Sequence, residues 1–191
     1  LAGLDVFSLT DHDTVAGIQP ALDEIARLES PLELLTGAEL TCYDAAGREW
    51  HMLAYGFDHR NPRVTGFLEA RVREREARIH RILEKLAAAG APLQLGDVLA
   101  ISRGGVIGRL HVAKALLDKG YCLNVPAAFQ RYLVEGAPAY VPKPAITPEA
   151  MVVEVHAWGA AAVLAHPVQF KAPEELDAAL ECGVDGVEAY H

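Results

Sequence analysis

The sequence lacks both a set of paired cysteines and any long apolar run. Its three cysteines, Cys42, Cys122 and Cys182, are odd in number and far apart, which indicates neither a disulfide framework nor a Cys-x-x-Cys metal site. No apolar stretch approaches the length that spans a bilayer, and nothing at the N-terminus resembles a signal peptide. We therefore predict reduced cysteines, mostly in the core, no membrane partner and a cytoplasmic location.

Basic residues are also scarce, because 17 Lys and Arg stand against 26 Asp and Glu, for a formal net charge of −9. Holding a long nucleic acid requires a dense basic surface, so we exclude long duplex nucleic acid and keep a nucleotide or a short oligonucleotide as the substrate. Apolar residues are abundant, at 51% of the chain, which is enough for a sizeable core in one domain with an elaboration. The sequence leaves the oligomeric state unknown.

Four apolar runs with the character of strands lead directly into polar side chains. They lie at residues 4–13, 34–39, 161–166 and 184–191. Continuous apolar runs are typical of buried parallel strands, whose carboxyl ends gather ligands in α/β folds. We therefore favour a shared metal or phosphate site at one face of a sheet. The alternative for each run is a structural role, such as a helix cap or a histidine with a satisfied hydrogen bond.

The order of the elements indicates an α/β fold. Residues 14–28 have helical spacing, with Asp13 or Thr14 as the predicted cap, and they separate two predicted strands in a right-handed β-α-β unit. Alternating helices and strands resume at Thr147-Pro148, a cap followed by proline at the first helical position. This alternation favours a parallel barrel or a doubly wound sheet.

A helical segment interrupts this framework. Helix patterns lie at residues 62–89, 109–117 and 126–133. The first is rich in arginine, which favours a solvated face paired with glutamates, the alternative being that one arginine reaches a substrate phosphate. We therefore predict a helical insertion over residues 62–142, set into a framework formed by residues 1–61 and 143–191.

Three histidines and one glutamate at or near the strand ends form a candidate ligand set, namely His12, Glu39, His51 and His166. Imidazole nitrogen together with carboxylate oxygen suits Zn, Mn or Fe better than Ca or Mg, and we allow two or three such ions. The strand over residues 49–55 carries His51 close to Glu39 if it pairs with the preceding strand as a hairpin. The set therefore predicts a divalent metal site.

Asp11 and Asp13 flank His12 in the sequence. A carboxylate next to a ligating histidine can fix the tautomer of the ring and raise its basicity, and we favour this role, or direct metal binding, more for Asp11 than for Asp13. The alternative is that either aspartate only caps the following helix.

A glycine-rich segment, residues 104–111, precedes a predicted helix and contains Arg109 and His111. Backbone amides and these two side chains could together hold a phosphate, although the segment lacks the Gly-Lys-Ser/Thr ending of a Walker loop. The alternative is a flexible loop followed by a capped helix.

These residues in combination resemble the PHP (polymerase and histidinol phosphatase) family of metal-dependent phosphoesterases. The resemblance is carried by Leu9–Gly17, Gly37–Leu40, His51–Tyr55, Gly108–Ala113, Val163–Pro167 and Val187–His191. It is closest to the subgroup of 3′,5′-nucleoside bisphosphate phosphatases and 5′ to 3′ exoribonucleases of the RNase AM type. The resemblance implies a distorted (β/α)7 barrel, only part of which lies in this chain, with a helical insertion.

The resemblance also implies roles for single residues. It implies that the metal ligands are His12, Glu39, His51 and His166, and that Arg109 and His111 bind the substrate phosphate. We assign catalytic roles to Asp11 and His191. The opening His-x-His and closing Asp-x-His of the family are absent, and the chain starts at Leu1 without methionine. We therefore expect a chain truncated at both ends that holds metal poorly by itself.

The function expected from this reading is metal-dependent hydrolysis of phosphate esters of nucleotides. The expected substrates are the 3′-phosphate of nucleoside 3′,5′-bisphosphates or the 5′ ends of short oligoribonucleotides, and the metal ions neutralise charge on the phosphoryl oxygens. One alternative is another phosphomonoesterase of the family, such as a histidinol phosphate phosphatase. The other is a module that keeps the PHP framework only as a scaffold.

Overall fold

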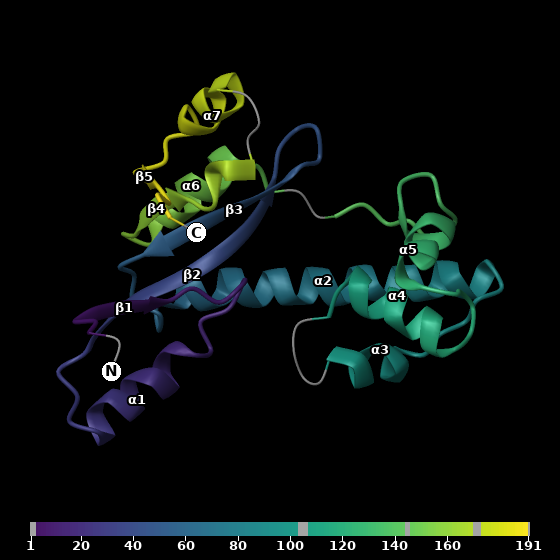
Figure 1. Ribbon diagram of the computed structural model, residues 1–191, viewed down its shortest axis with the longest axis horizontal. Coiled ribbons are helices and arrows are strands. Elements are labelled where there is room, and N and C mark those ends of the chain that lie inside the picture. The colour runs from purple at the N-terminus through teal and green to yellow at the C-terminus, as the bar shows by residue number, and fades with distance from the viewer. Residues whose placement is uncertain (1–2, 103–106, 144–145, 170–172, 191) are drawn as a thin grey trace. The chain divides into compact units, whose positions relative to one another are not determined.

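The computed structural model describes residues 3–102, 107–143, 146–169 and 173–190 (Figure 1). The chain divides into two compact units, one formed by Leu1–Leu68 with Ala145–His191 and the other by Glu69–Pro144. The first unit contains a five-stranded sheet together with helices. Among the described residues, no helix is both long enough and apolar enough to pass through a membrane.

The strands of the first unit follow one another across the sheet in chain order. They are β1 (Val6–Leu9), β2 (Glu33–Tyr43), β3 (Glu49–Tyr55), β4 (Ala161–Leu164) and β5 (Gly186–Val187). β1 pairs with β2 and β4 pairs with β5 in parallel, whereas β3 is antiparallel to both of its neighbours. The sheet is therefore mixed and not all parallel as the alternation of helices and strands suggested, because β3 pairs with β2 in the hairpin that the sequence left open.

The connections explain these directions. Helix α1 (Ile18–Arg27) supplies the crossover that lets β2 run parallel to β1, so the predicted β-α-β unit is confirmed. Residues 44–48 alone separate β2 from β3, and a parallel connection needs a dozen or more residues. The carboxylate of Asp44 closes this turn by accepting hydrogen bonds from the amide and Nε of Arg48, at 2.9 and 2.6 Å. The two strands therefore form the hairpin that would bring His51 close to Glu39.

One face of the hairpin packs into the core, and the other carries polar residues. Its even-numbered residues are buried in the apolar core, and they are Ala38, Leu40, Cys42, Trp50, Met52 and Ala54. Helix α6 (Pro148–Ala157) packs its Met151, Val152 and Val155 into the same core. Full burial of a side chain such as Leu40 contributes about 1.5–3 kcal/mol, and a slip of one residue would expose it. This register directs the odd-numbered residues, including Glu39 and His51, to the opposite face.

Helix α1 begins later than the sequence predicts. Its N-cap is Gly17, which has no side chain to cap the helix. Asp13, one of the predicted caps, is buried, and its Oδ1 accepts a hydrogen bond from the backbone amide of Thr41 at 3.1 Å. Its carboxylate therefore ties the segment after β1 to the middle of β2 instead of capping a helix.

The start of α6 agrees with the sequence. Thr147 is the N-cap and Pro148 follows at the first helical position, as predicted, and Thr147 Oγ1 accepts a hydrogen bond from the amide of Ala150 at 3.3 Å. β4 comes directly after this helix, and β5 follows a further helix, α7 (Pro173–Leu180). These elements complete the described part of the first unit, together with the short 3-10 helix η2 (Pro167–Gln169).

The second unit is helical over residues 69–102 and 107–143. Its elements are α2 (Pro62–Ala88, from Glu69 onward), α3 (Leu95–Ser102), α4 (Arg109–Asp118), α5 (Val125–Ala128) and the π-helical turn η1 (Phe129–Leu133). They bury a second apolar cluster that includes Ile82, Leu86, Val98, Leu116 and Leu133. The helix predicted over residues 126–133 is thus two elements, because the backbone changes to π-helical turns at Phe129.

The arginines of α2 differ in their surroundings. Arg73 pairs with Glu69 at 3.4 Å, and both side chains are exposed, as expected for a solvated helix face. Arg71 pairs with Glu74 at 3.0 Å, although its own side chain is only 14% exposed. Arg78 is an exception, because it is buried and donates hydrogen bonds from Nε and Nη2 to the carbonyl of Val141 at 3.0 and 2.8 Å. This arginine has a structural role within the second unit.

Candidate metal centre

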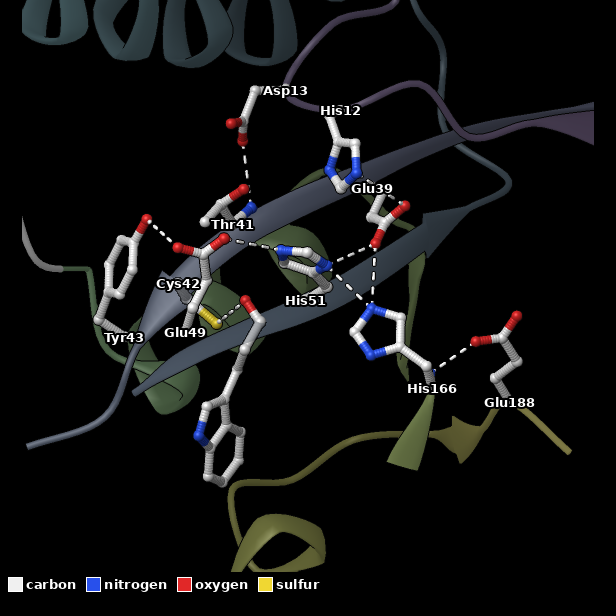
Figure 2. A network of polar contacts seen from close by, with 11 residues as sticks. His12, Asp13, Glu39, Thr41, Cys42, Tyr43, Glu49, His51, His166 and Glu188 are labelled. Atoms are coloured by element: carbon white, nitrogen blue, oxygen red, sulfur yellow. Dashed lines mark hydrogen bonds and ion pairs between the residues drawn. The ribbon is translucent and has the colours of Figure 1, made fainter. Parts of the chain in front are cut away.

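Three imidazoles and one carboxylate meet on the face of the sheet opposite the core (Figure 2). His51 Nδ1 lies 2.7 Å from Glu39 Oε1 and 2.9 Å from His166 Nε2. His166 Nε2 is also 3.3 Å from Glu39 Oε1, and His12 Nε2 is 3.6 Å from Glu39 Oε2. The structure therefore brings together all four residues of the predicted ligand set, with the glutamate at the centre.

The hairpin positions the central two residues. His51 on β3 stands opposite Thr41 on β2, and Glu39 stands opposite Leu53. Because side chains alternate along a strand, Glu39 and Thr41 share one face of β2, and His51 and Leu53 share the same face of β3. Glu39 and His51 are thus diagonal neighbours on this face, close enough for their side chains to touch.

Backbone pairing with β2 positions His12. His12 forms an isolated parallel bridge with Glu39. The amide of Glu39 donates to the carbonyl of Asp11 at 3.1 Å, and the amide of Asp13 donates to the carbonyl of Glu39 at 2.8 Å. Asp13 adopts φ of 52°, a left-handed conformation that aspartate tolerates better than most residues. The buried Asp13 carboxylate thus holds a turn that presents the His12 ring at the rim of the cluster.

His166 follows the end of β4 in a conformation that needs support. Its φ is 31°, in the left-handed region, where backbone strain has to be compensated. Its backbone amide donates to Glu188 Oε2 at 2.6 Å, and the neighbouring Ala165 amide donates to the carbonyl of His51 at 3.0 Å. Glu188, next to β5, therefore anchors His166. The only sequence signal for this role of Glu188 is that it is an acidic residue at the end of a predicted strand.

The structure describes only one of the two predicted catalytic residues, Asp11. Among the described residues, His12, Glu39 and His51 offer potential ligand atoms that all lie within 4.8 Å of one another. Neither Asp11 nor His166 belongs to this group of three, although His166 Nε2 contacts both Glu39 and His51. The carboxylate of Asp11 lies against Gly17, where an added Cβ would come within 2.9 Å of Oδ2. His191 lies outside the described residues.

Negative charge dominates the surroundings of the cluster. The pKa of His51 is raised because its ring bonds with Glu49 and because Glu39 adds Coulombic attraction. Burial raises the pKa of the Tyr55 phenol, and the charges of Glu188 and Glu39 raise it further. Surroundings that favour a positive imidazolium also favour a bound cation, which would take the place of the proton.

The donor set fits a divalent metal ion. Imidazole nitrogens and a carboxylate oxygen are the usual ligands of zinc and of related transition metals. Ligand atoms at about 2.0–2.2 Å from a tetrahedral zinc ion are separated from one another by about 3.4 Å. The separations of 2.7 to 3.6 Å between the Glu39 oxygens and the three imidazole nitrogens bracket this value.

Arg109 and His111 both lie in the first turn of α4, within the second unit. The Arg109 guanidinium lies 5.9 Å from the centre of the Phe129 ring, and its Nη1 donates to the carbonyl of Leu133 at 3.4 Å. His111 Nδ1 accepts a hydrogen bond from the amide of Gly108 at 3.1 Å and so helps to cap the helix. Residues 104–106 of the glycine-rich segment lie outside the described residues.

Comparison with known proteins relates the chain to enzymes of phosphate esters. No protein-family model matches the sequence. The chain is 36% identical over 168 residues to a 5′-3′ exoribonuclease of Haemophilus influenzae, covering 88% of this chain and 60% of the relative. It is 30% identical over 174 residues to a 3′,5′-nucleoside bisphosphate phosphatase of Chromobacterium violaceum, covering 86% of this chain and 57% of the relative. The chain thus spans less than two thirds of the length of these relatives.

Two solved structures share the fold. One, from Bifidobacterium adolescentis, is described as a metal-dependent phosphoesterase and matches with a TM-score of 0.72 and 31% identity, over 99% of this chain and 68% of that one. The other, described as an amidohydrolase from Chromobacterium violaceum with bound sulfate and no metal, matches with a TM-score of 0.72 and 25% identity, over 96% and 66%. Because the chain is 31% identical to the Bifidobacterium adolescentis phosphoesterase and covers 68% of it, and because its sequence relatives agree, the chain belongs to the PHP family of metal-dependent phosphoesterases.

Proposed function

We propose that the protein hydrolyses phosphate esters of nucleotides at a divalent metal centre held by His12, Glu39, His51 and His166. The observation that carries this proposal is the meeting of these side chains from four separate segments around one carboxylate. Four such residues brought together without a ligand would leave a charged and costly arrangement partly shielded from water. A bound cation explains why the fold gathers them.

The residues of the chain have separate tasks in this proposal. Glu39 supplies the central charge, and Asp13 and Glu188 hold the backbone on either side through Thr41 and His166. When bound, the ions neutralise charge on the phosphoryl oxygens and favour deprotonation of the attacking water. Asp11 and His191 are our candidates for further catalytic groups. We propose two or three ions of Mn, Zn or Fe in the whole protein.

We propose that the second unit, predicted as an insertion over residues 62–142, contributes the substrate site. Arg109 is the candidate for phosphate binding, since a guanidinium can make two parallel hydrogen bonds to one phosphate. His111 is the second candidate, through the ring nitrogen that does not cap the helix. We also propose that the framework over residues 1–61 and 143–191 forms part of a distorted (β/α)7 barrel, and the likeness of the chain to two solved structures supports a mixed α/β fold.

The names of the relatives support nucleotide substrates. One is a 5′-3′ exoribonuclease and the other a nucleoside bisphosphate phosphatase, so both act on phosphate esters of nucleotides or RNA. We therefore propose the 3′-phosphate of a nucleoside 3′,5′-bisphosphate, or the 5′ end of a short oligoribonucleotide, as the substrate of the whole protein. A cytoplasmic location stays a prediction of the sequence.

The test uses the full-length protein, treated with a chelator and reloaded with Mn²⁺, Zn²⁺ or Fe²⁺. Three substrates separate the alternatives: a nucleoside 3′,5′-bisphosphate, a 5′-phosphorylated short RNA and histidinol phosphate. We expect turnover of one of the first two, dependent on metal and lost in His12→Ala. His59→Ala is the matched control, because His59 bonds with Gln19 and not with the cluster. Hydrolysis of histidinol phosphate alone would favour the other phosphatase, and no hydrolysis by the loaded protein would favour the scaffold module.

A further inference from the structure

We propose that Glu49 is a positioning residue that fixes the tautomer and orientation of His51 for metal binding, and that Tyr43 holds Glu49 in place. This inference rests on the proposed function, since it concerns one of the four candidate ligands. Its basis is the distinct surroundings of the two ring nitrogens of His51.

The two nitrogens of His51 face different partners (Figure 2). Nδ1 points into the cluster, 2.7 Å from Glu39 Oε1 and 2.9 Å from His166 Nε2. Nε2 points the other way and lies 3.2 Å from Glu49 Oε1. The arrangement therefore divides the ring into a side that faces the cluster and a side that faces a second carboxylate.

A neutral imidazole has one nitrogen with a proton and one with a lone pair. A metal ion at the cluster needs the lone pair on Nδ1, so the proton has to be on Nε2. Glu49 Oε1 is placed to accept this Nε2–H, and a carboxylate acceptor stabilises that tautomer and increases the basicity of the opposite nitrogen. Glu49 thus acts on the metal through His51 and does not contact it.

The sheet builds this arrangement from its register. Glu49 and His51 are two residues apart on β3, so their side chains lie on the same face. Tyr43 stands directly opposite Glu49 across the β2–β3 pair. The hydroxyl of Tyr43 donates to Glu49 Oε2 at 3.1 Å, while His51 Nε2 lies 3.2 Å from Oε1. The two oxygens of Glu49 therefore have separate partners, and Tyr43 limits the rotation of the carboxylate.

The exposure of the residues fits a supporting role. The side chain of Glu49 is 44% exposed, whereas those of His51 and Glu39 are 18% and 16% exposed. Glu49 thus stands at the rim while the side of the ring that faces the cluster is enclosed. His166 is fixed differently, through its backbone amide and Glu188, so loss of Glu49 should disturb one ligand and leave the others in place.

The experiment measures Zn²⁺ affinity of the full-length protein by isothermal titration calorimetry. Glu49→Ala should raise the Kd about 10- to 100-fold, the usual loss when the carboxylate partner of a ligating histidine is removed. Glu49→Gln should raise the Kd less, because the amide oxygen of glutamine can still accept the Nε2–H. Tyr43→Phe should raise the Kd less than either Glu49 variant. Glu33→Ala removes an exposed carboxylate from the first position of β2 and should leave the Kd unchanged.

A second readout separates positioning from general damage. In the zinc-loaded protein labelled with ¹⁵N-histidine, nuclear magnetic resonance should show His51 bound through Nδ1, with an Nε2–H proton that exchanges slowly with water. Glu49→Ala should speed this exchange while circular dichroism stays unchanged. The inference is overturned if Glu49→Ala binds zinc as tightly as Glu33→Ala, or if His51 binds zinc through Nε2.

A further variant keeps this inference distinct from the proposed function. If His51→Ala weakens zinc binding and Glu49→Ala does not, only the role of Glu49 is wrong. If His51→Ala binds zinc as the wild type does, the proposed ligand set is itself wrong.

Discussion

The metal centre and the first turn of α4 place their polar groups in two different ways. The four candidate ligands come from segments up to 154 residues apart, His12 to His166, and meet only because strands pair in one register. Arg109 and His111 are two residues apart on one helix, and their position within the turn follows from local structure. The geometry of the four candidate ligands therefore depends on the fold of the whole first unit, whereas the placement of Arg109 and His111 depends mainly on where α4 begins.

The strongest test of this difference removes the central carboxylate. Glu39→Gln keeps the shape of the side chain but takes away the charge that His12, His51 and His166 surround. We expect loss of bound metal and a decrease in kcat/KM of about 10³-fold, which corresponds to several kcal/mol of transition-state stabilisation. Elemental analysis and phosphate release measure the two effects. A variant that retained stoichiometric metal would show that the cluster has another purpose.

A second test concerns the packing that brings the segments together. A Cβ at Gly37 would come within 2.2 Å of Ser8 Oγ and 3.0 Å of the Leu9 carbonyl, between β1 and β2. Gly37→Ala should therefore lower the free energy of unfolding by about 1–3 kcal/mol, as overpacking does. Denaturation with urea measures the change.

The matched control for this test is Gly66→Ala in α2, where an added Cβ meets nothing within 4 Å. It should raise the free energy of unfolding by about 0.5–1 kcal/mol, because alanine favours a helix. Equal effects at Gly37 and Gly66 would contradict the view that strand contacts position the site.

We expect a smaller effect from a substitution at Arg109, in the first turn of α4. Arg109→Lys replaces a fork of donors with a point charge, so kcat/KM for phosphorylated nucleotides should decrease at least about tenfold, or roughly 1.4 kcal/mol. Metal content should not change, in contrast to Glu39→Gln. Full activity of Arg109→Lys would show that this arginine does not bind the substrate phosphate. Loss of metal in this variant would show that Arg109 also affects the metal centre.

The smallest expected effect concerns how the stability of the protein changes at low pH through Glu154 on α6. Glu154 on α6 accepts two hydrogen bonds from Arg63, both at 2.9 Å, and one from Trp158 Nε1 at 2.8 Å. The bonds to Arg63, and then the bond to Trp158, lower the pKa of Glu154 below its ordinary 4.5. Its stabilising contribution is therefore complete above about pH 4.5 and is lost as the pH falls through the lower folded value.

Glu154→Gln should accordingly lower the Tm at neutral pH and have progressively less effect below pH 4.5, as measured by circular dichroism. Glu24→Gln is the control, because Glu24 pairs with Arg27 on an exposed turn of α1 and should barely change the Tm. If the decrease in Tm caused by Glu154→Gln became larger as the pH fell, it would contradict this stabilising role of the Glu154 carboxylate.

The sequence by itself determined most of the strands and helices around the site and which side chains could bind a metal, but it did not predict α3. Thr147-Pro148 marked the start of α6, and imidazoles near strand ends indicated the ligand set, because these signals are local. The metal-binding role of that set stays a prediction. The family resemblance, which the comparisons confirm, came from the same short motifs.

Only the tertiary structure decided how those pieces are used. Asp13 bonds with Thr41 instead of capping α1, His111 Nδ1 accepts a hydrogen bond from the amide of Gly108, and Arg78 is buried. Glu49 and Glu188 gained roles that no motif indicated. The physical reason is that residue spacing specifies a face of a strand or helix, whereas partners such as His166 and Glu188 are chosen by strand register across distant segments.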